Sequence, residues 1–150
     1  MPRRLLATAH FSSCSSQLQH IRCLVRRILL EQQCPTEPAA HIVLAVNEAC
    51  MNIMQHAYGC GDAGEIILEI FNNRGTLIFR LTDFAEPTDR TCLEPRDVSI
   101  VRPGGLGVHL IREIMDEVTF LNTEGLNNRE GVGNVLEMKI SIDKAKQEQP

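Results

Sequence analysis

The segment from Thr36 to Tyr58, TEPAAHIVLAVNEACMNIMQHAY, limits the possible folds of this chain more than any other stretch. Apolar residues dominate it, which predicts a helix packed against other elements around most of its circumference. Polar residues nevertheless recur along one line of that helix at its period of about 3.6 residues per turn; they are His41, Glu48, Asn52, Gln55 and His56. Burying a carboxylate or an amide is costly without a partner, so this line predicts either a polar cleft or a solvent-facing side.

The rest of the chain places predicted strands and helices around this segment. A strand is predicted at residues 4–11, followed by helices at 12–34 and 36–58 and by two strands in a hairpin at 65–84. A long loop at 85–104 then leads to a helix at 105–118 and to strands at 118–122 and 133–142. Serines are expected to cap the first helix and Thr36 the second, and residues 143–150 are expected to fray as a disordered tail. The order lacks the βαβ repetition of a Rossmann fold. It predicts one α+β domain over residues 1–150, a two-layer α/β sandwich whose mostly antiparallel sheet carries helices on one face.

Composition excludes several classes of protein. No apolar run approaches the ~18 residues of a membrane span, and the basic start MPRRLLATAHFSS does not have the pattern of a signal peptide. The six cysteines include no CxxC pair, which argues against a zinc site and favours reduced thiols in a cytoplasmic protein. Cys23 and Cys50 sit among apolar helical residues, where a free cysteine behaves as a small hydrophobic residue.

Charge is spread unevenly along the chain. The net charge is −4, which argues against direct nucleic-acid binding by the whole chain. Residues 1–34 nevertheless carry five arginines and one glutamate, so an acidic body follows a basic segment. Arg22 and Arg26 lie four residues apart and off the apolar stripe of their helix, so we expect both to be exposed. This basic face is either a partner surface or an ordinary solvated helix face.

Three further features lie downstream of the polar helix. Asp83 ends a predicted strand, the stretch 85–104 with three prolines is predicted to be a lid, and GGLG from Gly104 places a glycine-rich turn at a helix start. Backbone N–H groups at such a start can hold phosphate oxygens, although glycines also begin helices for steric reasons. The four features in this order point to a phosphate-binding site more strongly than any one of them does.

With these motifs the chain resembles the GHKL (Bergerat-fold) ATP-binding domains, and more narrowly the bacterial anti-sigma factor serine/threonine kinases. AVNEACMNIMQHAYG resembles their N-box and LTDFAEP their first glycine box. RPGGLGVHLIREIMDEVTF is similar to their second glycine box and the helix after it, and GNVLEMKI to their closing strand. The resemblance extends from about residue 5 to 142.

The resemblance implies a role for each matching residue. Asn52 is implied as a Mg²⁺ ligand, Glu48 as the general base for an attacking hydroxyl, and Asp83 as the acceptor for the adenine amino group. The remaining implied nucleotide contacts are His56, Arg102, Gly104, Gly105, Leu106, Gly107 and Val108. Of these, Gly105 and Gly107 are implied to let the lid backbone wrap the phosphates, His56 is expected to shape the pocket, and Arg102 contacts a phosphate or is a solvated lid residue.

Two positions depart from the family pattern. Ala85 stands where the first glycine box usually has glycine, and Asn134 stands where many relatives have a threonine near the adenine. Both are matched to the nucleotide pocket by position. They put nucleotide affinity in question more than they do the fold.

The same resemblance implies cofactors and partners. It implies ATP and Mg²⁺ as cofactors, a serine of an anti-anti-sigma (STAS) protein as the phosphoryl acceptor, a sigma factor as a second partner, and a homodimer. Arg22 and Arg26 are candidates for binding either partner. Two alternatives remain open: a nucleotide-binding partner switch without phosphoryl transfer, or a detached ATP-binding domain of a histidine kinase. The predicted strand and long helix at the start leave no room for a phosphoacceptor hairpin, which argues against the second alternative.

Overall fold

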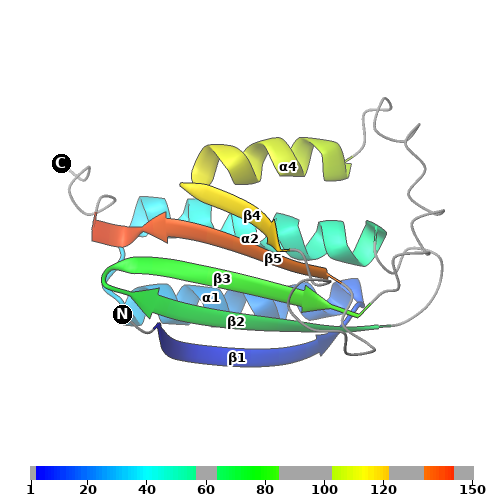
Figure 1. Cartoon of the computed structure of the whole chain (residues 1–150), viewed down its shortest axis with the longest axis horizontal. Coiled ribbons are helices and arrows are strands. Elements are labelled where there is room, and N and C mark those ends of the chain that lie inside the picture. The colour runs from blue at the N-terminus through cyan, green and yellow to red at the C-terminus, as the bar shows by residue number, and fades with distance from the viewer. Residues whose placement is uncertain (1–2, 57–63, 85–102, 122–133, 144–150) are drawn as a thin grey trace.

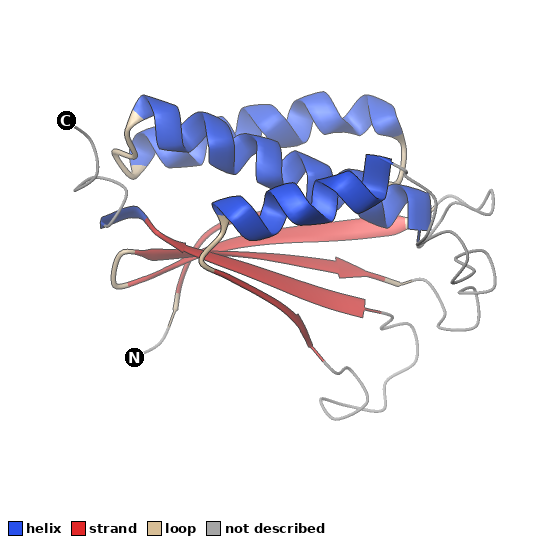
Figure 2. Ribbon diagram, turned by 90° about the horizontal axis from the view of Figure 1, so that it is seen from above, coloured by secondary structure: helices blue, strands red, loops and turns tan. Residues whose placement is uncertain are grey.

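The computed structural model describes residues 3–56, 64–84, 103–121 and 134–143. Within them, three α-helices cover one face of a five-stranded sheet, and the other face carries no helix (Figures 1 and 2). The strands are β1 (Arg4–Ser12), β2 (Glu65–Asn73), β3 (Thr76–Asp83), β4 (Glu117–Leu121) and β5 (Asn134–Ser141). Their order is β1-β2-β3-β5-β4, and all four pairings are antiparallel. The predicted α+β sandwich is confirmed.

The hairpin between β2 and β3 sets the register at the centre of the sheet. Arg74 and Gly75 form its two-residue turn with φ of 55° and 89°. Two successive positive φ values are typical of the tight turns whose twist matches that of the flanking strands. In this register Leu68 lies opposite Leu81, and Ile66 lies opposite Asp83. Alternation along β3 therefore places Asp83 on the same, helix-covered side as Leu81.

The first helix is shorter than the sequence predicts. A 3₁₀ turn (Ser15–Gln17) precedes α1 (Leu18–Glu31), and neither Cys14 nor Gln17 makes a side-chain cap hydrogen bond at these starts. The prediction of serine caps is therefore wrong. The apolar stripe is confirmed: Leu18, Ile21, Val25, Ile28 and Leu29 are buried. Cys23 of the same helix is exposed, so it does not pack as a small hydrophobic residue, whereas Cys50 is buried.

The second helix, α2 (Thr36–His56), lies between α1 and α4 (Pro103–Ile114) in the helix layer. Thr36 is already helical, and the Ala39 N–H donates to the Pro35 carbonyl at 2.9 Å, so the helix begins at Thr36 itself and the cap position falls one residue earlier than expected, on Pro35. The fully buried residues on α2 include Ile42, Ala45, Val46 and Cys50, which pack with α1 and the sheet in one apolar core. Contacts on two sides explain why only a narrow line of α2 is polar.

The third helix differs from the prediction at both ends. α4 begins at Pro103, a residue type favoured at the first helical position, and ends at Ile114; β4 follows from Glu117. Gly104, Gly105 and Gly107 therefore lie within the first turns of the helix backbone rather than in a turn before it. None of the helices described is both long and apolar enough to span a membrane.

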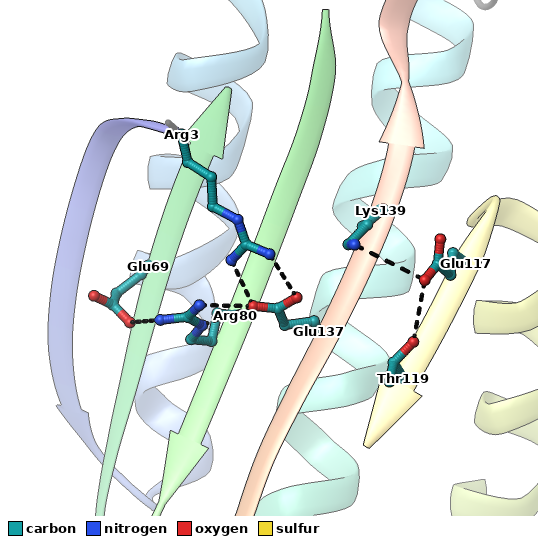
Figure 3. Close-up of polar contacts among 7 residues, drawn as sticks. All are labelled: Arg3, Glu69, Arg80, Glu117, Thr119, Glu137 and Lys139. Carbon is teal, nitrogen blue, oxygen red and sulfur yellow. Dashed lines mark hydrogen bonds and ion pairs between the residues drawn. The ribbon is translucent and has the colours of Figure 1, made fainter. Parts of the chain in front are cut away.

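The helix-free face of the sheet carries an ion-pair network (Figure 3). Glu137 on β5 is 3% exposed and accepts hydrogen bonds from Arg3 Nη1 at 2.7 Å and Arg80 Nε at 2.8 Å. Arg80 also pairs with Glu69 at 3.7 Å, and both guanidinium groups lie over the Phe71 ring. Arg3 thus connects the segment before β1 to β5, across β2 and β3.

Candidate functional site

The predicted site residues gather at one end of the molecule. The C-terminal ends of α2 and β3 lie there, together with the N-terminal ends of α4 and β5 (Figure 1). These four ends carry the N-box line, Asp83, the glycine-rich run and Asn134, respectively. Antiparallel pairing of β3 with β5 brings Asp83 opposite Asn134, although 51 residues separate them in sequence.

On α2, the most informative atom of the polar line is Asn52 Oδ1. It is buried and has no hydrogen-bond partner among the described residues. Glu48, one turn earlier, is half-buried, while His41 and Gln55 at either end of the line are exposed. The His56 side chain lies outside the described residues. The predicted polar line therefore has a half-buried centre at Glu48 and Asn52 between exposed ends.

At the end of β3, Asp83 is 4% exposed. Its Oδ1 accepts a hydrogen bond from Asn134 Nδ2 at 3.0 Å. A buried carboxylate needs such donors, because its desolvation is costly. Asn134 departs from the family pattern in the sequence. In the structure its side chain orients Asp83 by a hydrogen bond between neighbouring strands.

Part of the predicted site cannot be placed. Ala85, Arg102 and the predicted lid between them lie outside the described residues. Of the glycine-rich run, the backbone of Gly104 to Val108 is helical, and the Leu106 and Val108 side chains lie outside the described part. The helix nevertheless starts at the same end as Asn52 and Asp83 (Figure 1).

The donor set fits a nucleotide with its metal ion. The buried amide oxygen of Asn52, without a partner in the described part of the chain, is a suitable hard ligand for Mg²⁺, which prefers oxygen donors. A helix N-terminus that carries glycines supplies N–H groups that favour phosphate oxygens. The buried Asp83 carboxylate is a hydrogen-bond acceptor of the kind that an exocyclic amino group requires. The half-buried carboxylate of Glu48 is available to accept a proton.

Sequence reasoning missed one polar residue of α2. Asn47, directly before Glu48, is 8% exposed, and its Oδ1 accepts a hydrogen bond from Arg22 Nη1 at 2.9 Å. Arg22 is consequently half-buried, whereas Arg26 is exposed. The expectation that both arginines are exposed is wrong for Arg22. The available signal was a polar residue off the main line of α2, and its side chain contacts Arg22 of α1.

Comparison with known proteins identifies the family. The profile of the histidine kinase-like ATPase domain matches residues 11–140. The chain is 34% identical over 93 residues to the serine-protein kinase RsbW of Bacillus cereus (strain AH820), which covers 55% of the chain and 56% of the relative. It is 32% identical over 99 residues to the serine-protein kinase RsbW of Listeria monocytogenes serotype 4a (strain HCC23), which covers 61% of the chain and 63% of the relative.

These matches differ in what they establish. The alignments with the curated relatives span 56% and 63% of those proteins' own length, so their activity is not transferred to this chain by similarity alone. The family profile, in contrast, covers all the elements from the end of β1 to β5. On the evidence of this match, of the antiparallel sheet with helices on one face, and of the polar cluster at its end, the chain belongs to the family of histidine kinase-like ATPase domains.

Proposed function

We propose that this protein is an ATP-dependent serine/threonine kinase that regulates a sigma factor. In this proposal it phosphorylates a serine of an anti-anti-sigma STAS-domain protein and binds the sigma factor as its other partner. It acts in the cytoplasm as a homodimer. The observation that carries the proposal is the buried Asn52 Oδ1, which has no hydrogen-bond partner among the residues that the structure describes and lies one helical turn from Glu48, at the same end of the fold as Asp83. The name serine-protein kinase of both relatives supports the choice of acceptor.

Each residue of the site has a distinct task in this proposal. Asp83, held by Asn134, accepts a hydrogen bond from the adenine amino group and so selects the base. Asn52 holds the Mg²⁺ that accompanies ATP, and that ion offsets the negative charge of the phosphates. The backbone at Gly105 and Gly107 contacts phosphate oxygens. His56, Ala85, Arg102, Gly104, Leu106 and Val108 complete the proposed pocket.

Glu48 supplies the acid–base chemistry. Its carboxylate accepts the proton of the attacking serine hydroxyl, which makes the oxygen a better nucleophile. Phosphoryl transfer depends mainly on positioning and on compensation of charge, so the contribution of Glu48 adds to that of the groups that hold ATP. A rigid position on α2, a helix packed between α1 and α4, keeps Glu48 and Asn52 at a fixed spacing.

The partner surface is proposed on α1. Arg26 is exposed and Arg22 is half-buried four residues earlier, in the basic N-terminal part of an acidic chain. Arginine forms directional pairs with carboxylates at interfaces. The variant Arg22→Glu with Arg26→Glu is expected to weaken binding of the STAS protein or the sigma factor and to leave ATP affinity unchanged. Equal affinity for both partners in the variant and the wild type at low salt would remove α1 from the interface.

Radiolabelled ATP with Mg²⁺ tests the kinase proposal directly. The purified chain is incubated with each STAS-domain protein encoded in its own genome, and the labelled product is subjected to phosphoamino-acid analysis. Phosphoserine that is lost in Glu48→Gln supports the kinase. Phosphohistidine would identify a histidine kinase domain, and ATP binding without any label would identify a nucleotide-dependent switch.

A further inference from the structure

Among the described residues, Asn47 and Glu137 are the buried polar groups that the proposed reaction does not use, and Asn47 is the one beside the proposed site. It lies on α2 directly before Glu48 and is 8% exposed. Its Oδ1 accepts from Arg22 Nη1 of α1 at 2.9 Å, and its Nδ2 donates to Met51 Sδ at 3.4 Å. The amide therefore connects the helix of the proposed nucleotide site to the helix of the proposed partner surface.

An asparagine is a poor choice for this position on packing grounds alone. It is a weaker helix former than alanine, and burying its amide is favourable only if the amide is bonded. The two helices pack against each other, and both contribute buried apolar residues such as Val25 and Val46 to the same core. The main structural consequence of an amide here is the fixed position of the Arg22 guanidinium.

The hydrogen bond holds Arg22 without cancelling its charge. An amide is neutral, and no acidic side chain in the described part of the chain forms an ion pair with Arg22. Arg3 and Arg80, in contrast, are paired with Glu137, and Arg27 pairs with Glu31 at 3.9 Å. A guanidinium has five N–H donors, so an arginine held through one Nη keeps donors for a second acceptor.

We propose that Asn47 is a positioning residue, which holds the still-charged Arg22 guanidinium at the boundary of α1 and α2 for a carboxylate of the protein substrate. The inference rests on the proposed role of α1 in partner binding. A preorganised guanidinium binds a carboxylate with less loss of side-chain entropy than a freely rotating one. Asn47 therefore affects substrate affinity through Arg22, and it does not touch the reacting atoms.

Two substitutions at the same position separate positioning from simple packing. Asn47→Ala removes the acceptor, so Arg22 becomes mobile but keeps its charge. Asn47→Asp keeps an acceptor of nearly the same shape, so Arg22 stays in place but its charge is compensated by the new carboxylate. If the hydrogen bond between Asn47 and Arg22 only stabilised the packing of the two helices, Asn47→Asp would preserve it and would leave the affinity for the protein substrate unchanged. Asn72→Ala is the control for loss of an asparagine that joins two elements: Asn72 of β2 donates to Gln32 Oε1, directly after α1, at 2.7 Å and accepts from the Gly75 N–H at 2.9 Å, and it contacts neither Arg22 nor Arg26 in the described structure.

The first measurement needs no partner. Phenylglyoxal modifies accessible arginines. The intact folded protein is treated with this reagent and then digested, and mass spectrometry of the peptides gives a separate modification rate for Arg22 and for the exposed Arg26. Loss of one hydrogen bond to a charged group should raise the Arg22 rate about tenfold or more in Asn47→Ala. The rate should stay low in Asn47→Asp and in Asn72→Ala. An Arg22 rate that is the same in the wild type and in Asn47→Ala overturns the inference.

The second measurement uses the STAS protein that the wild-type chain labels. Both Asn47 variants should raise KM for that protein about fivefold or more, with kcat and the KM for ATP unchanged, whereas Asn72→Ala should behave as wild type. A wild-type KM in Asn47→Asp would overturn the claim that the charge of Arg22 is used. If the wild type labels no STAS protein, the proposed function fails instead, and the phenylglyoxal rates alone decide whether Asn47 positions Arg22.

Discussion

Replacing Asn52 with alanine should stabilise the nucleotide-free protein while it abolishes nucleotide binding. The Oδ1 atom is buried and has no partner in the described part of the chain, and an unsatisfied buried acceptor costs about 1–3 kcal/mol. Alanine also has the better helix propensity, by up to ~0.7 kcal/mol. The lost contacts of a half-buried amide offset part of both gains. We therefore expect the free energy of unfolding to rise by about 1 kcal/mol, or roughly 2–4 °C in Tm for a domain of this size.

Added nucleotide should reverse that order of stability. A ligand that binds only the folded state adds about 2.7 kcal/mol at 100 times its Kd. The wild type should gain this from ATP with Mg²⁺, and Asn52→Ala should not. Urea unfolding followed by far-UV circular dichroism, with and without nucleotide, measures both effects. Asn47→Ala is the control, since its bonded oxygen predicts destabilisation. A less stable nucleotide-free Asn52→Ala, or equal stabilisation of both proteins by ATP, would refute this reasoning.

Three further predictions concern other parts of the fold. Glu48→Gln should retain ATP affinity but lose about 10²–10⁴-fold in phosphoryl transfer, and a loss of only a few-fold in the kinase assay would exclude a general base at this position. Glu137→Gln should cost about 1–3 kcal/mol at pH 7 by leaving two arginines less well paired. Burial alone raises the pKa of Glu137, but hydrogen bonds and charges of the two arginines outweigh it and lower the pKa below 4.5. The wild type should therefore have its full excess in free energy of unfolding over Glu137→Gln above pH 4.5, and this excess should disappear as the pH falls through the folded pKa of Glu137. Urea unfolding of both proteins across this pH range measures it, and a difference in free energy of unfolding that stays constant at every pH would contradict the prediction. Finally, the hydrogen bond with Ser16 lowers the pKa of the exposed Cys14 thiol, whereas burial raises the pKa of Cys50 to about 12. Cys14 should therefore react with a disulfide reagent at pH 7.5 well before Cys50, and the reverse order would contradict the burial of Cys50 in the core.

The elements that the sequence predicts well are those with a strong local signal. The stripe on α1 follows from periodicity, and the turn between β2 and β3 follows from Gly75, the residue type that adopts a positive φ freely. The start of α4 at Pro103 could also have been predicted, because proline favours the first helical position. The absence of a serine cap on α1 could not have been predicted from the sequence, because a 3₁₀ turn precedes the helix in place of a capping residue.

The parts of the site that escaped prediction depend on tertiary neighbours. Periodicity placed Glu48 and Asn52 on one line of α2, but the packing of α1 and α4 decides which members of that line are half-buried. The bond between Arg22 and Asn47 joins two helices, and no spacing within either helix encodes it. Glu137 lies in a strand that appears mainly apolar, and its partners become evident only once the strand order is known.

The central claim is that the end of the sheet at Asp83 binds ATP, and calorimetric titration of ATP in the presence of Mg²⁺ tests it most directly. The matched variant is Asp83→Asn, which keeps an oxygen acceptor for Asn134 but removes the negative charge that favours the adenine amino group. The account predicts one ATP bound per wild-type chain and an affinity at least tenfold lower in the variant, a difference of about 1.4 kcal/mol. No binding by the wild type, or equal affinity in both proteins, would contradict it.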